Sequence, residues 1–313
     1  MFAYVVRRLL ATIVVMAVVA FVVFLLLYLT PGDPAAILAG DAATVDDIRR
    51  IREKLGLDQP FIIRFGEWAW ALLRGDLGTS IFTNLPVTHL IAQRIEPTVA
   101  LTVCTLLVAV LVAVPLGVVA AAKAGTWIDR SVMGFTVIGF SLPVFVLAYI
   151  LIMVFSIELD WLPVQGYRPI SEGVWEWLRH LILPSIALGT VYIALIARIT
   201  RASILDVLAQ DYIRTAQAKG LAPSAVLMSH ALKNAAVPIV TVIGIGIALL
   251  IGGAIVTETV FAIPGIGRLT VDAILRRDYP IIQGMILIFS GAYVLINLLV
   301  DLSYMFFDPR IRY

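Results

Sequence analysis

The residues that could carry out catalysis or bind a metal are few and far apart in this chain. Its three histidines are His89, His180 and His230, and its single cysteine is Cys104. The chain contains no G-x-x-x-x-G-K-S/T phosphate loop, no His-Glu-x-x-His metal motif and no G-x-S-x-G nucleophile elbow. The sequence therefore predicts no catalytic residue, no metal site and no cofactor, and any ATP hydrolysis would have to be done by another protein.

The composition places these residues in a membrane protein. Of the 313 residues, 61% are hydrophobic and 14% are charged, and the mean hydropathy is +1.00. Soluble proteins average roughly 45–50% apolar and about 25% charged residues. The net charge of +2 gives no reason to expect a nucleic-acid partner. We therefore expect an all-α polytopic protein whose helices cross a lipid bilayer.

Six runs without charged residues are close to the roughly 20 residues that a helix needs to cross the hydrocarbon core. They are 9–29, 98–122, 131–157, 181–197, 235–257 and 281–300. The first is too long for the core of a signal peptide and no small-residue cleavage site follows it, so we interpret it as a retained span. The predicted organisation is an N-terminus and first span over 1–30, a loop with short helices over 31–97, and a five-span core over 98–313.

Lysine and arginine residues set the expected orientation, because short cytoplasmic loops carry more of them than short outside loops do. With a cytoplasmic N-terminus, eleven of these residues lie inside and five lie in the two short outside loops. The inside residues are Arg7, Arg8, Lys123, Arg130, Arg198, Arg201, Arg214, Lys219, Lys233, Arg310 and Arg312, and the outside residues are Arg168, Arg179, Arg268, Arg276 and Arg277. We therefore expect both termini in the cytoplasm and the long loop 30–97 outside it.

Two short helices are expected in this outer loop. Residues 45–55 repeat apolar side chains at helical spacing, and Gly56 ends the pattern. Residues 61–73 are rich in aromatic and aliphatic side chains, which is typical of a helix in the headgroup region. One interpretation of this segment is an interfacial anchor. The other is a docking surface for an outside partner, formed by Phe61, Phe65, Trp68 and Trp70.

The cytoplasmic loop 198–234 has a pattern of its own. From 203 to 219, apolar side chains return every three or four positions; Gly220 then interrupts, and Ala222-Pro223-Ser224 can open a second helix. We expect a helix, a glycine turn and a helix. Such a short basic loop is suited to transmitting force from a cytoplasmic partner. The alternative is a helix resting on the inner leaflet with its basic residues at anionic lipid.

Acidic residues inside the predicted spans would suggest an ion or proton pathway. Glu258, at the outer end of the fifth span, and Asp301, at the inner end of the sixth, are the two that come close. We expect both to lie near an interface. Because no charge relay is visible, a proton-coupled carrier is poorly supported, and energy has to come from another protein.

The cytoplasmic loop contains the run Asp211-Tyr212-Ile213-Arg214-Thr215-Ala216-Gln217-Ala218-Lys219-Gly220-Leu221, followed by His230-Ala231-Leu232-Lys233-Asn234-Ala235 and Pro238. These runs resemble the signature loop of binding-protein-dependent ABC transporter permeases. Further motifs that resemble the family are Pro31-Gly32-Asp33-Pro34, Gly75-Asp76-Leu77-Gly78-Thr79-Ser80, Pro264-Gly265-Ile266-Gly267-Arg268, Arg276-Arg277-Asp278-Tyr279-Pro280 and Asp308-Pro309-Arg310-Ile311-Arg312. They span essentially the whole chain.

The chain is most similar to the dipeptide, oligopeptide and nickel branch of this family, and is closest to the first permease subunit of a bacterial dipeptide transporter. Two features depart from the broad family pattern: Arg214-Thr215-Ala216 stands where that pattern has Glu-Ala-Ala, and Pro238 falls several residues late. Both departures resemble the peptide branch.

The resemblance implies a set of partners. Residues of the signature loop would form coupling helices against an ATPase, namely Asp211, Tyr212, Ile213, Arg214, Thr215, Ala216, Ala218, Lys219, Gly220 and Leu221. The implied partners are two ATP-binding cassette ATPase subunits, a second homologous permease subunit and an extracytoplasmic substrate-binding protein, at the bacterial inner membrane. The implied substrate is a dipeptide or a short oligopeptide. Nickel or a nickel chelate is the alternative within the family, and a stand-alone secondary carrier or channel is the alternative outside it.

Overall fold

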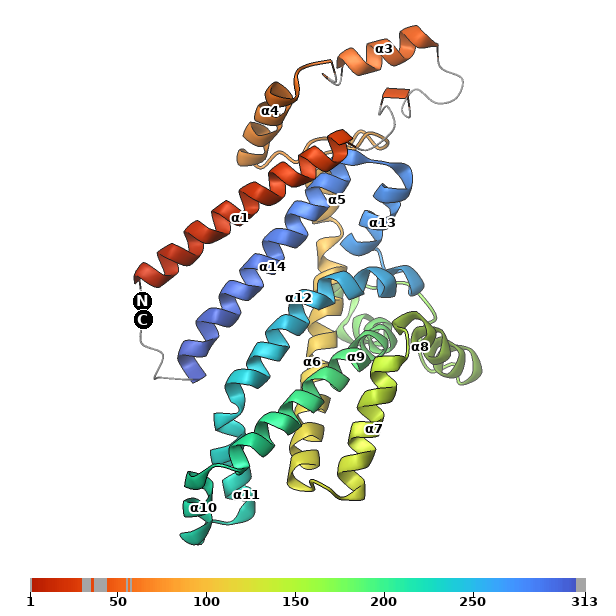
Figure 1. Ribbon diagram of the computed structural model, residues 1–313. Helices are drawn as coiled ribbons and strands as arrows, with labels where there is room; N and C mark the ends of the chain where they lie inside the picture. The colour runs from red at the N-terminus through yellow and green to blue at the C-terminus, as the bar shows by residue number, and fades with distance from the viewer. Residues whose placement is uncertain (1, 30–34, 37–43, 55, 57, 308–313) are drawn as a thin grey trace. The chain divides into compact units, whose positions relative to one another are not determined.

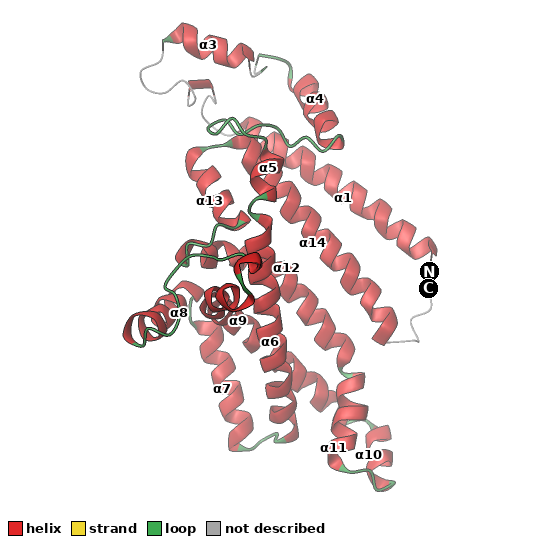
Figure 2. Cartoon of the chain, turned by 180° about the vertical axis from the view of Figure 1, so that it is seen from behind, coloured by secondary structure: helices red, strands yellow, loops and turns green. Residues whose placement is uncertain are grey.

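The computed structural model describes residues 2–29, 35, 36, 44–54, 56 and 58–307. These residues form helices joined by loops, with an isolated β-bridge between Thr79 and Pro86 (Figure 2). The expected all-α class is therefore confirmed. The motifs over 31–34 and 308–312 lie outside the described residues.

The chain divides into two compact units. The first, here the core unit, comprises 95–268 and 293–307, and the second, here the loop unit, comprises 2–94 and 269–292. The core unit holds α6 (Ile95–Ala122), α7 (Trp127–Ser141), α8 (Val144–Leu151), α9 (Val174–Leu208), α10 (Asp211–Ala218), α11 (Pro223–Ala225) and α12 (Ala236–Val260). The loop unit holds α1 (Phe2–Leu29), α3 (Val45–Lys54), α4 (Phe61–Leu73), α5 (Val87–Ala92) and most of α13 (Ile266–Arg276). Helix α14 (Tyr279–Phe307) begins in the loop unit and ends in the core unit.

Helix α9 is the centre of the core unit. It packs against α6, α7, α8 and α12, and its contact with α6 is the most extensive between any two helices (Figure 1). Within its apolar window 72% of the residues are buried, against 28% for Val87–Ala122 and 11% for Tyr279–Leu302. Small residues line the α6–α9 contact, including Ala113 and Gly117 on α6 and Gly189 and Ala197 on α9, so the two backbones approach closely.

Three helices of the described residues are long and apolar enough to cross a membrane, and up to five spans result if each of two bent helix pairs is one span. The segment Leu10–Leu26 is a shorter apolar helix within α1. The fourth expected span, 181–197, is the middle of α9, which is 35 residues long. Charged residues on both sides of 181–197 ended the charge-free run in the sequence, but they do not end the helix. The total of six spans stays a prediction.

The third expected span is broken in its middle. Helix α7 ends at Ser141, α8 begins at Val144, and the two segments meet at an angle of 102°. Pro143 has no backbone N–H to continue the α7 hydrogen-bond ladder, and its ring disfavours the helical conformation for the residue before it. Leu142 is accordingly extended, with φ −84° and ψ 123°. A π-helix over Ile152–Glu158 completes this segment.

Close packing of α6 on α9 generates the first testable prediction. A Cβ atom added to Gly117 would lie 2.6 Å from the Cβ of Thr200 and 2.7 Å from the carbonyl oxygen of Ala197. We expect Gly117→Leu to force the helices apart and cost about 1–3 kcal/mol, as overpacking typically does. Thermal unfolding in detergent measures this. Gly134→Leu on α7 is the matched control, because nothing lies within 4 Å of a Cβ there. Equal melting temperatures for the two variants would contradict the packing.

Candidate functional site: the coupling hairpin and its supports

Residues 211–232 form a hairpin at the end of α9, here called the coupling hairpin. Helix α10 ends at Ala218, and Gly220 turns the chain with φ +80°. The Gly220 N–H donates to the Gln217 carbonyl at 2.9 Å, which satisfies part of the C-terminus of α10. Pro223 then opens α11, which continues as a π-helix over Val226–Leu232. The glycine turn and the helix after it are as the periodicity predicts. The single helix expected over 203–219 is instead broken, because 203–208 are the end of α9 and α10 begins at Asp211.

One face of the coupling hairpin is buried against the core unit. Ile213 has an exposed fraction of 0%, and Ala216, Val226 and Ala231 are also buried. Ala231 joins an apolar cluster with Ile204 of α9 and Ala121 of α6. Because these contacts come from two long helices, the hairpin is held to their ends and does not hang free as a loop.

The opposite face of the coupling hairpin is exposed. Of the ten residues predicted to contact an ATPase, Ile213 and Ala216 point inward and the other eight are exposed. Tyr212 is 45% exposed, and Leu221 and Met228 of the same hairpin are exposed as well. Arg214 makes an ion pair with Asp211 at 3.5 Å, but both side chains are largely in solvent, so the pair contributes little. The hairpin thus offers a mixed apolar and basic face.

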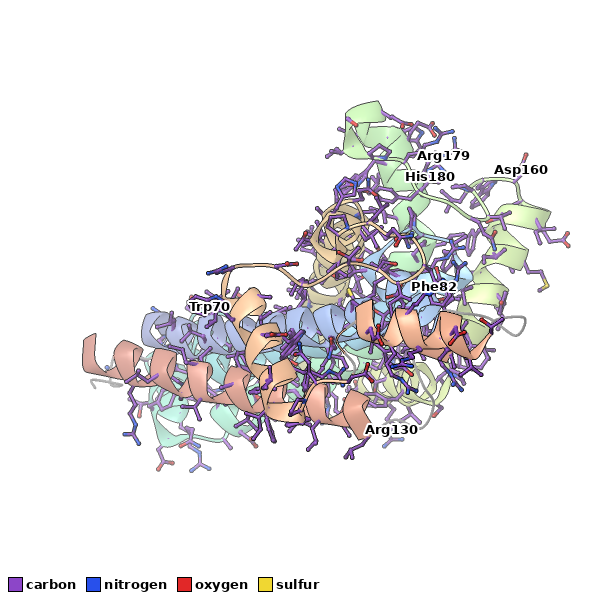
Figure 3. The ribbon with its side chains drawn as sticks, turned by 90° about the horizontal axis from the view of Figure 1, so that it is seen from above. Trp70, Phe82, Arg130, Asp160, Arg179 and His180 are labelled. Atoms are coloured by element: carbon purple, nitrogen blue, oxygen red, sulfur yellow. The ribbon has the colours of Figure 1, made fainter. Side chains whose placement is uncertain are left out.

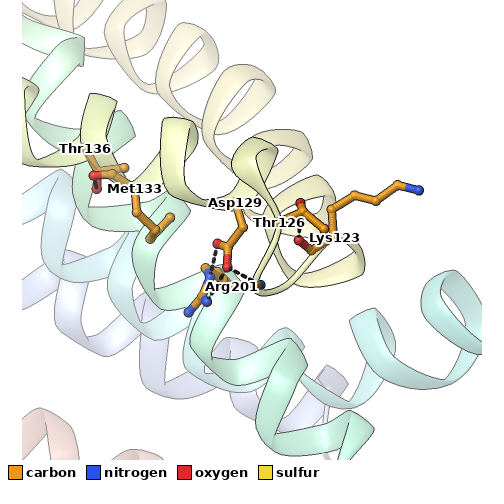
Figure 4. A network of polar contacts seen from close by, with 7 residues as sticks. Lys123, Thr126, Asp129, Met133, Thr136 and Arg201 are labelled. Carbon is orange, nitrogen blue, oxygen red and sulfur yellow. Dashed lines mark hydrogen bonds and ion pairs between the residues drawn. The ribbon is translucent and has the colours of Figure 1, made fainter.

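An ion pair fastens α7 to α9 one helical turn before Ile204. Arg201 donates from Nε to Oδ1 of Asp129 at 2.5 Å and from Nη2 to Oδ2 at 2.7 Å (Figure 4). The Gly125 N–H also donates to Oδ2 of Asp129, at 2.9 Å. Asp129 is buried in the first turn of α7, where a negative charge is favoured by the helix dipole. A bidentate pair of this kind fixes the orientation of both groups.

A second buried carboxylate, that of Glu258, joins α6, α12 and the start of α13 at the other end of the core unit. Glu258, in the last turn of α12, is fully buried and accepts from the Thr98 hydroxyl at 2.5 Å and from the Arg268 N–H at 2.9 Å. The Thr98 hydroxyl in turn accepts from the Ile266 N–H at 2.9 Å. Ile266 and Arg268 lie in the first turn of α13, whose N–H groups have no partners within the helix. Glu258 and Thr98 therefore cap α13 from α12 and α6.

This cap explains the two glycines of the Pro264–Arg268 motif. A Cβ added to Gly265 would lie 2.2 Å from the Glu258 carboxylate, and one added to Gly267 would lie 2.8 Å from the Cα of Ile255. Glycine is needed at both positions because the carboxylate and the helix occupy the space of a side chain. The position of Glu258 at the end of a predicted span suggested only that it lies near the membrane interface. The sequence contains no local signal for its partner Thr98, which is 160 residues away.

Loop 159–173 adds polar contacts at the same end of the core unit. The Gly166 N–H donates to the Phe261 carbonyl at 2.8 Å, the Tyr167 hydroxyl donates to Glu96, and the Trp177 indole N–H donates to the Tyr167 hydroxyl. Burial raises the pKa of the Tyr167 hydroxyl, and its hydrogen bond to Glu96 raises that pKa further. Tyr167 therefore stays protonated at neutral pH and keeps donating to Glu96.

The aromatic residues proposed for docking lie on α4 in the loop unit. Phe61, Phe65 and Trp68 pack against Phe24 of α1, with ring centroids 5.3–5.4 Å apart. Trp70, near the end of α4, is 57% exposed, with the Arg74 guanidinium 4.7 Å from its ring centroid (Figure 3). Trp70 is therefore the one of the four predicted docking residues that presents most of its surface to a partner.

The described residues contain no group of three or more His, Cys, Asp or Glu side chains that could hold a metal ion. The polar residues that the structure brings together are instead Asp129 with Arg201 and Glu258 with Thr98. Sequence patterns missed Asp129 and Thr98. Each partner lies on a different helix, so neither pair has a characteristic spacing.

Comparison with known proteins agrees with this architecture. Residues 113–313 match the family described as binding-protein-dependent transport system inner membrane component, and residues 1–102 match the N-terminal part described for the same kind of membrane component. The chain belongs to this family of permease subunits of ABC importers. Such a permease works with an ATPase and a substrate-binding protein at the inner membrane.

The relatives match along their full length. A probable peptide ABC transporter permease of Sinorhizobium fredii is 57% identical over 310 residues, covering 99% of each chain. A putative peptide transport system permease of Brucella abortus is 44% identical, and a glutathione transport system permease of Pectobacterium atrosepticum is 46% identical, each covering 100% of both chains. Among solved structures, the inward-facing MetNI methionine ABC transporter has a TM-score of 0.59 at 18% identity, covering 71% of this chain and 97% of that chain. That likeness shows the fold alone.

The Asp129–Arg201 pair predicts a large effect on stability. Asp129→Ala removes both charged hydrogen bonds and leaves the guanidinium of Arg201 without them, so we expect a loss of about 2 kcal/mol. The measurement is the apparent melting temperature in detergent. Asp206→Ala on the exposed side of α9 is the control and should melt like the wild type. If Asp129→Ala melts no lower than this control, the pair does not hold α7 to α9.

The cap on α13 predicts a difference between two substitutions of Thr98. Thr98→Val keeps the volume but removes the hydroxyl that joins Glu258 to Ile266, so it leaves a buried carboxylate short of a donor. We expect a cost of about 1–3 kcal/mol. Thr98→Ser keeps the hydroxyl and should cost much less. Melting temperatures of the two variants check this, and an equal loss in both would contradict the role of the hydroxyl.

Proposed function

We propose that the chain is one of two permease subunits of an ATP-driven importer of dipeptides or short oligopeptides. The proposal rests chiefly on the full-length similarity to a probable peptide ABC transporter permease at 57% identity. Glutathione, named for another relative, is itself a tripeptide, which is consistent with a peptide substrate. Nickel remains the alternative from sequence, and ligand identification on the partner binding protein distinguishes the two.

The proposed orientation places both termini and the coupling hairpin in the cytoplasm, as the distribution of Lys and Arg predicts. In this orientation the exposed face around Tyr212 and Leu221 is available to an ATP-binding cassette ATPase. The complete importer would hold this chain, a second homologous permease, two ATPase subunits and an extracytoplasmic binding protein.

The proposed mechanism is mechanical. Closure of the two ATPase subunits around ATP would move the coupling hairpin, which its buried face joins to α9 and α6. Helix α9 continues without a break from Leu208 to Val174, so a displacement at one end is carried through the core unit. Movement of the packed helices would then alternate access to the peptide between the two sides of the membrane.

ATP-dependent uptake tests the proposal directly. The complete importer, reconstituted in proteoliposomes with its binding protein, should accumulate a labelled dipeptide. Replacing the Walker lysine of the ATPase should abolish this accumulation. Uptake that persists without the ATPase subunits would contradict the proposal and favour a secondary carrier or channel.

The turn at Gly220 generates a prediction on coupling. Gly220 has φ +80°, and nothing lies within 4 Å of an added Cβ, so the effect of a substitution comes from backbone strain alone. The left-handed conformation costs roughly 1–2 kcal/mol for a residue with a Cβ. We expect Gly220→Val to distort the coupling hairpin, so that ATP hydrolysis continues while uptake falls severalfold.

Two controls separate the hairpin from general strain. Gly220→Asn should retain most uptake, because asparagine tolerates this conformation. Gly75→Val introduces the same strain at φ +80° in the loop after α4, also without crowding. The ratio of uptake to ATP hydrolysis is the measurement. Wild-type coupling in Gly220→Val, or equal uncoupling in Gly75→Val, would count against the role of the coupling hairpin.

A further inference from the structure

A small pocket in the loop unit is lined by four charged side chains, three of which have no partner among the described residues. Its volume is about 120 Å³. Its floor is apolar, with buried Leu90 of α5 and Ile281 of α14. Its charged lining comes from Arg94, after α5, from Asp272 and Arg276 on α13, and from Asp278. We call it the arginine pocket.

The guanidinium groups of Arg94 and Arg276 have no ion-pair, hydrogen-bond or aromatic partner among the described residues. Other arginines of the chain do have one: Arg201 binds Asp129, Arg168 binds Glu172, and Arg74 lies over Trp70. Arginine in a pocket without a carboxylate partner leaves five N–H donors per side chain for a ligand. Its planar geometry matches a carboxylate.

One acidic residue of the arginine pocket is already engaged. Asp278 is buried and accepts from the Ser80 hydroxyl at 2.6 Å and from the Ile81 N–H at 3.3 Å. These bonds tie the start of α14 to the loop before α5 and so fix the pocket wall. Asp272 has no partner among the described side chains, so the pocket offers a carboxylate beside its two guanidinium groups.

The shape and charges select the ligand. An apolar floor beneath guanidinium groups suits a short aliphatic stem that ends in a carboxylate, as in a glutamate or aspartate side chain. Charges of both signs suit a protein surface that carries a basic residue beside its acidic one, because Asp272 can bind the basic residue while the guanidinium groups bind the carboxylate. Phe82, 42% exposed at the pocket, adds the aromatic character typical of protein interfaces (Figure 3).

We propose that the arginine pocket receives an acidic side chain of the extracytoplasmic binding protein when that protein docks. This inference rests on the proposed function, which supplies the partner and puts the charged lining residues Arg94, Asp272 and Arg276 on the extracytoplasmic side. The arginine pocket would then be a second contact site for the binding protein in the loop unit, in addition to the exposed side chain of Trp70. The two arginines hold the carboxylate of the partner, and Asp272 faces a basic neighbour of that residue.

The test measures binding of the purified binding protein of the same transporter to the complete importer in nanodiscs. We expect Arg276→Glu and Arg94→Glu each to weaken binding at least about tenfold, and the wild-type affinity to fall with added salt. Arg277→Glu is the matched control, because Arg277 is the exposed neighbour that does not line the pocket, and it should bind like the wild type. One Glu→Lys or Asp→Lys change in the binding protein should restore binding to Arg276→Glu. Arg276→Gln, with a wild-type melting temperature, separates loss of charge from misfolding and should also bind more weakly.

Three results would overturn the inference. The first is unchanged affinity in Arg276→Glu and Arg94→Glu. The second is an equal loss in Arg277→Glu. The third is a phospholipid that native mass spectrometry finds on the wild type and not on Arg276→Glu, while the binding protein binds both alike. These outcomes differ from failure of the proposed function, in which the wild-type importer takes up no peptide although the binding protein still docks.

Discussion

Burial of α9 is the constraint on which the core unit depends. A helix of 35 residues is about 50 Å long, and its neighbours α6, α7, α8 and α12 cover most of its apolar window. Small residues bring α6 into close contact with it, and Asp129 binds Arg201 near its end. Since interiors packed in this way are not continuously deformable, the proposed mechanism requires a push on the coupling hairpin to be passed to the whole unit.

The two buried carboxylates solve the same problem at opposite ends of the core unit. A helix start leaves N–H groups without partners inside the helix, and a membrane supplies no water to satisfy them. Asp129 lies in the first turn of α7 and binds α9, whereas Glu258 of α12 receives an N–H of α13 with the help of Thr98. Each carboxylate thus accepts a backbone N–H at or just before a helix start, from Gly125 ahead of α7 and from Arg268 in α13, and joins two elements.

Features set by local residue patterns could be predicted from the sequence. The turn at Gly220 and the helices on either side of it followed from apolar spacing, although the break between α9 and α10 did not. Apolar spacing also predicted α3, and the aromatic and aliphatic composition of 61–73 predicted α4. The break at Pro143 was missed because counting charge-free residues ignores a proline within an apolar run. The link between Thr98 and Glu258 was missed because partners 160 residues apart leave no periodic signal. Packing of Phe61, Phe65 and Trp68 on α1 likewise depends on tertiary contacts.

We propose that the exposed face of the coupling hairpin contacts the ATPase while its buried face holds α9. Thiol crosslinking in the complete importer tests this contact, with single cysteines introduced in a Cys104→Ser background. Tyr212→Cys, on the exposed face, should crosslink to a cysteine in the cleft of the ATPase, with a yield that changes when ATP binds, and the adjacent buried Ile213→Cys should not. Crosslinking from Ile213→Cys alone, or labelling of Tyr212→Cys only by a reagent confined to the exterior, would contradict the account.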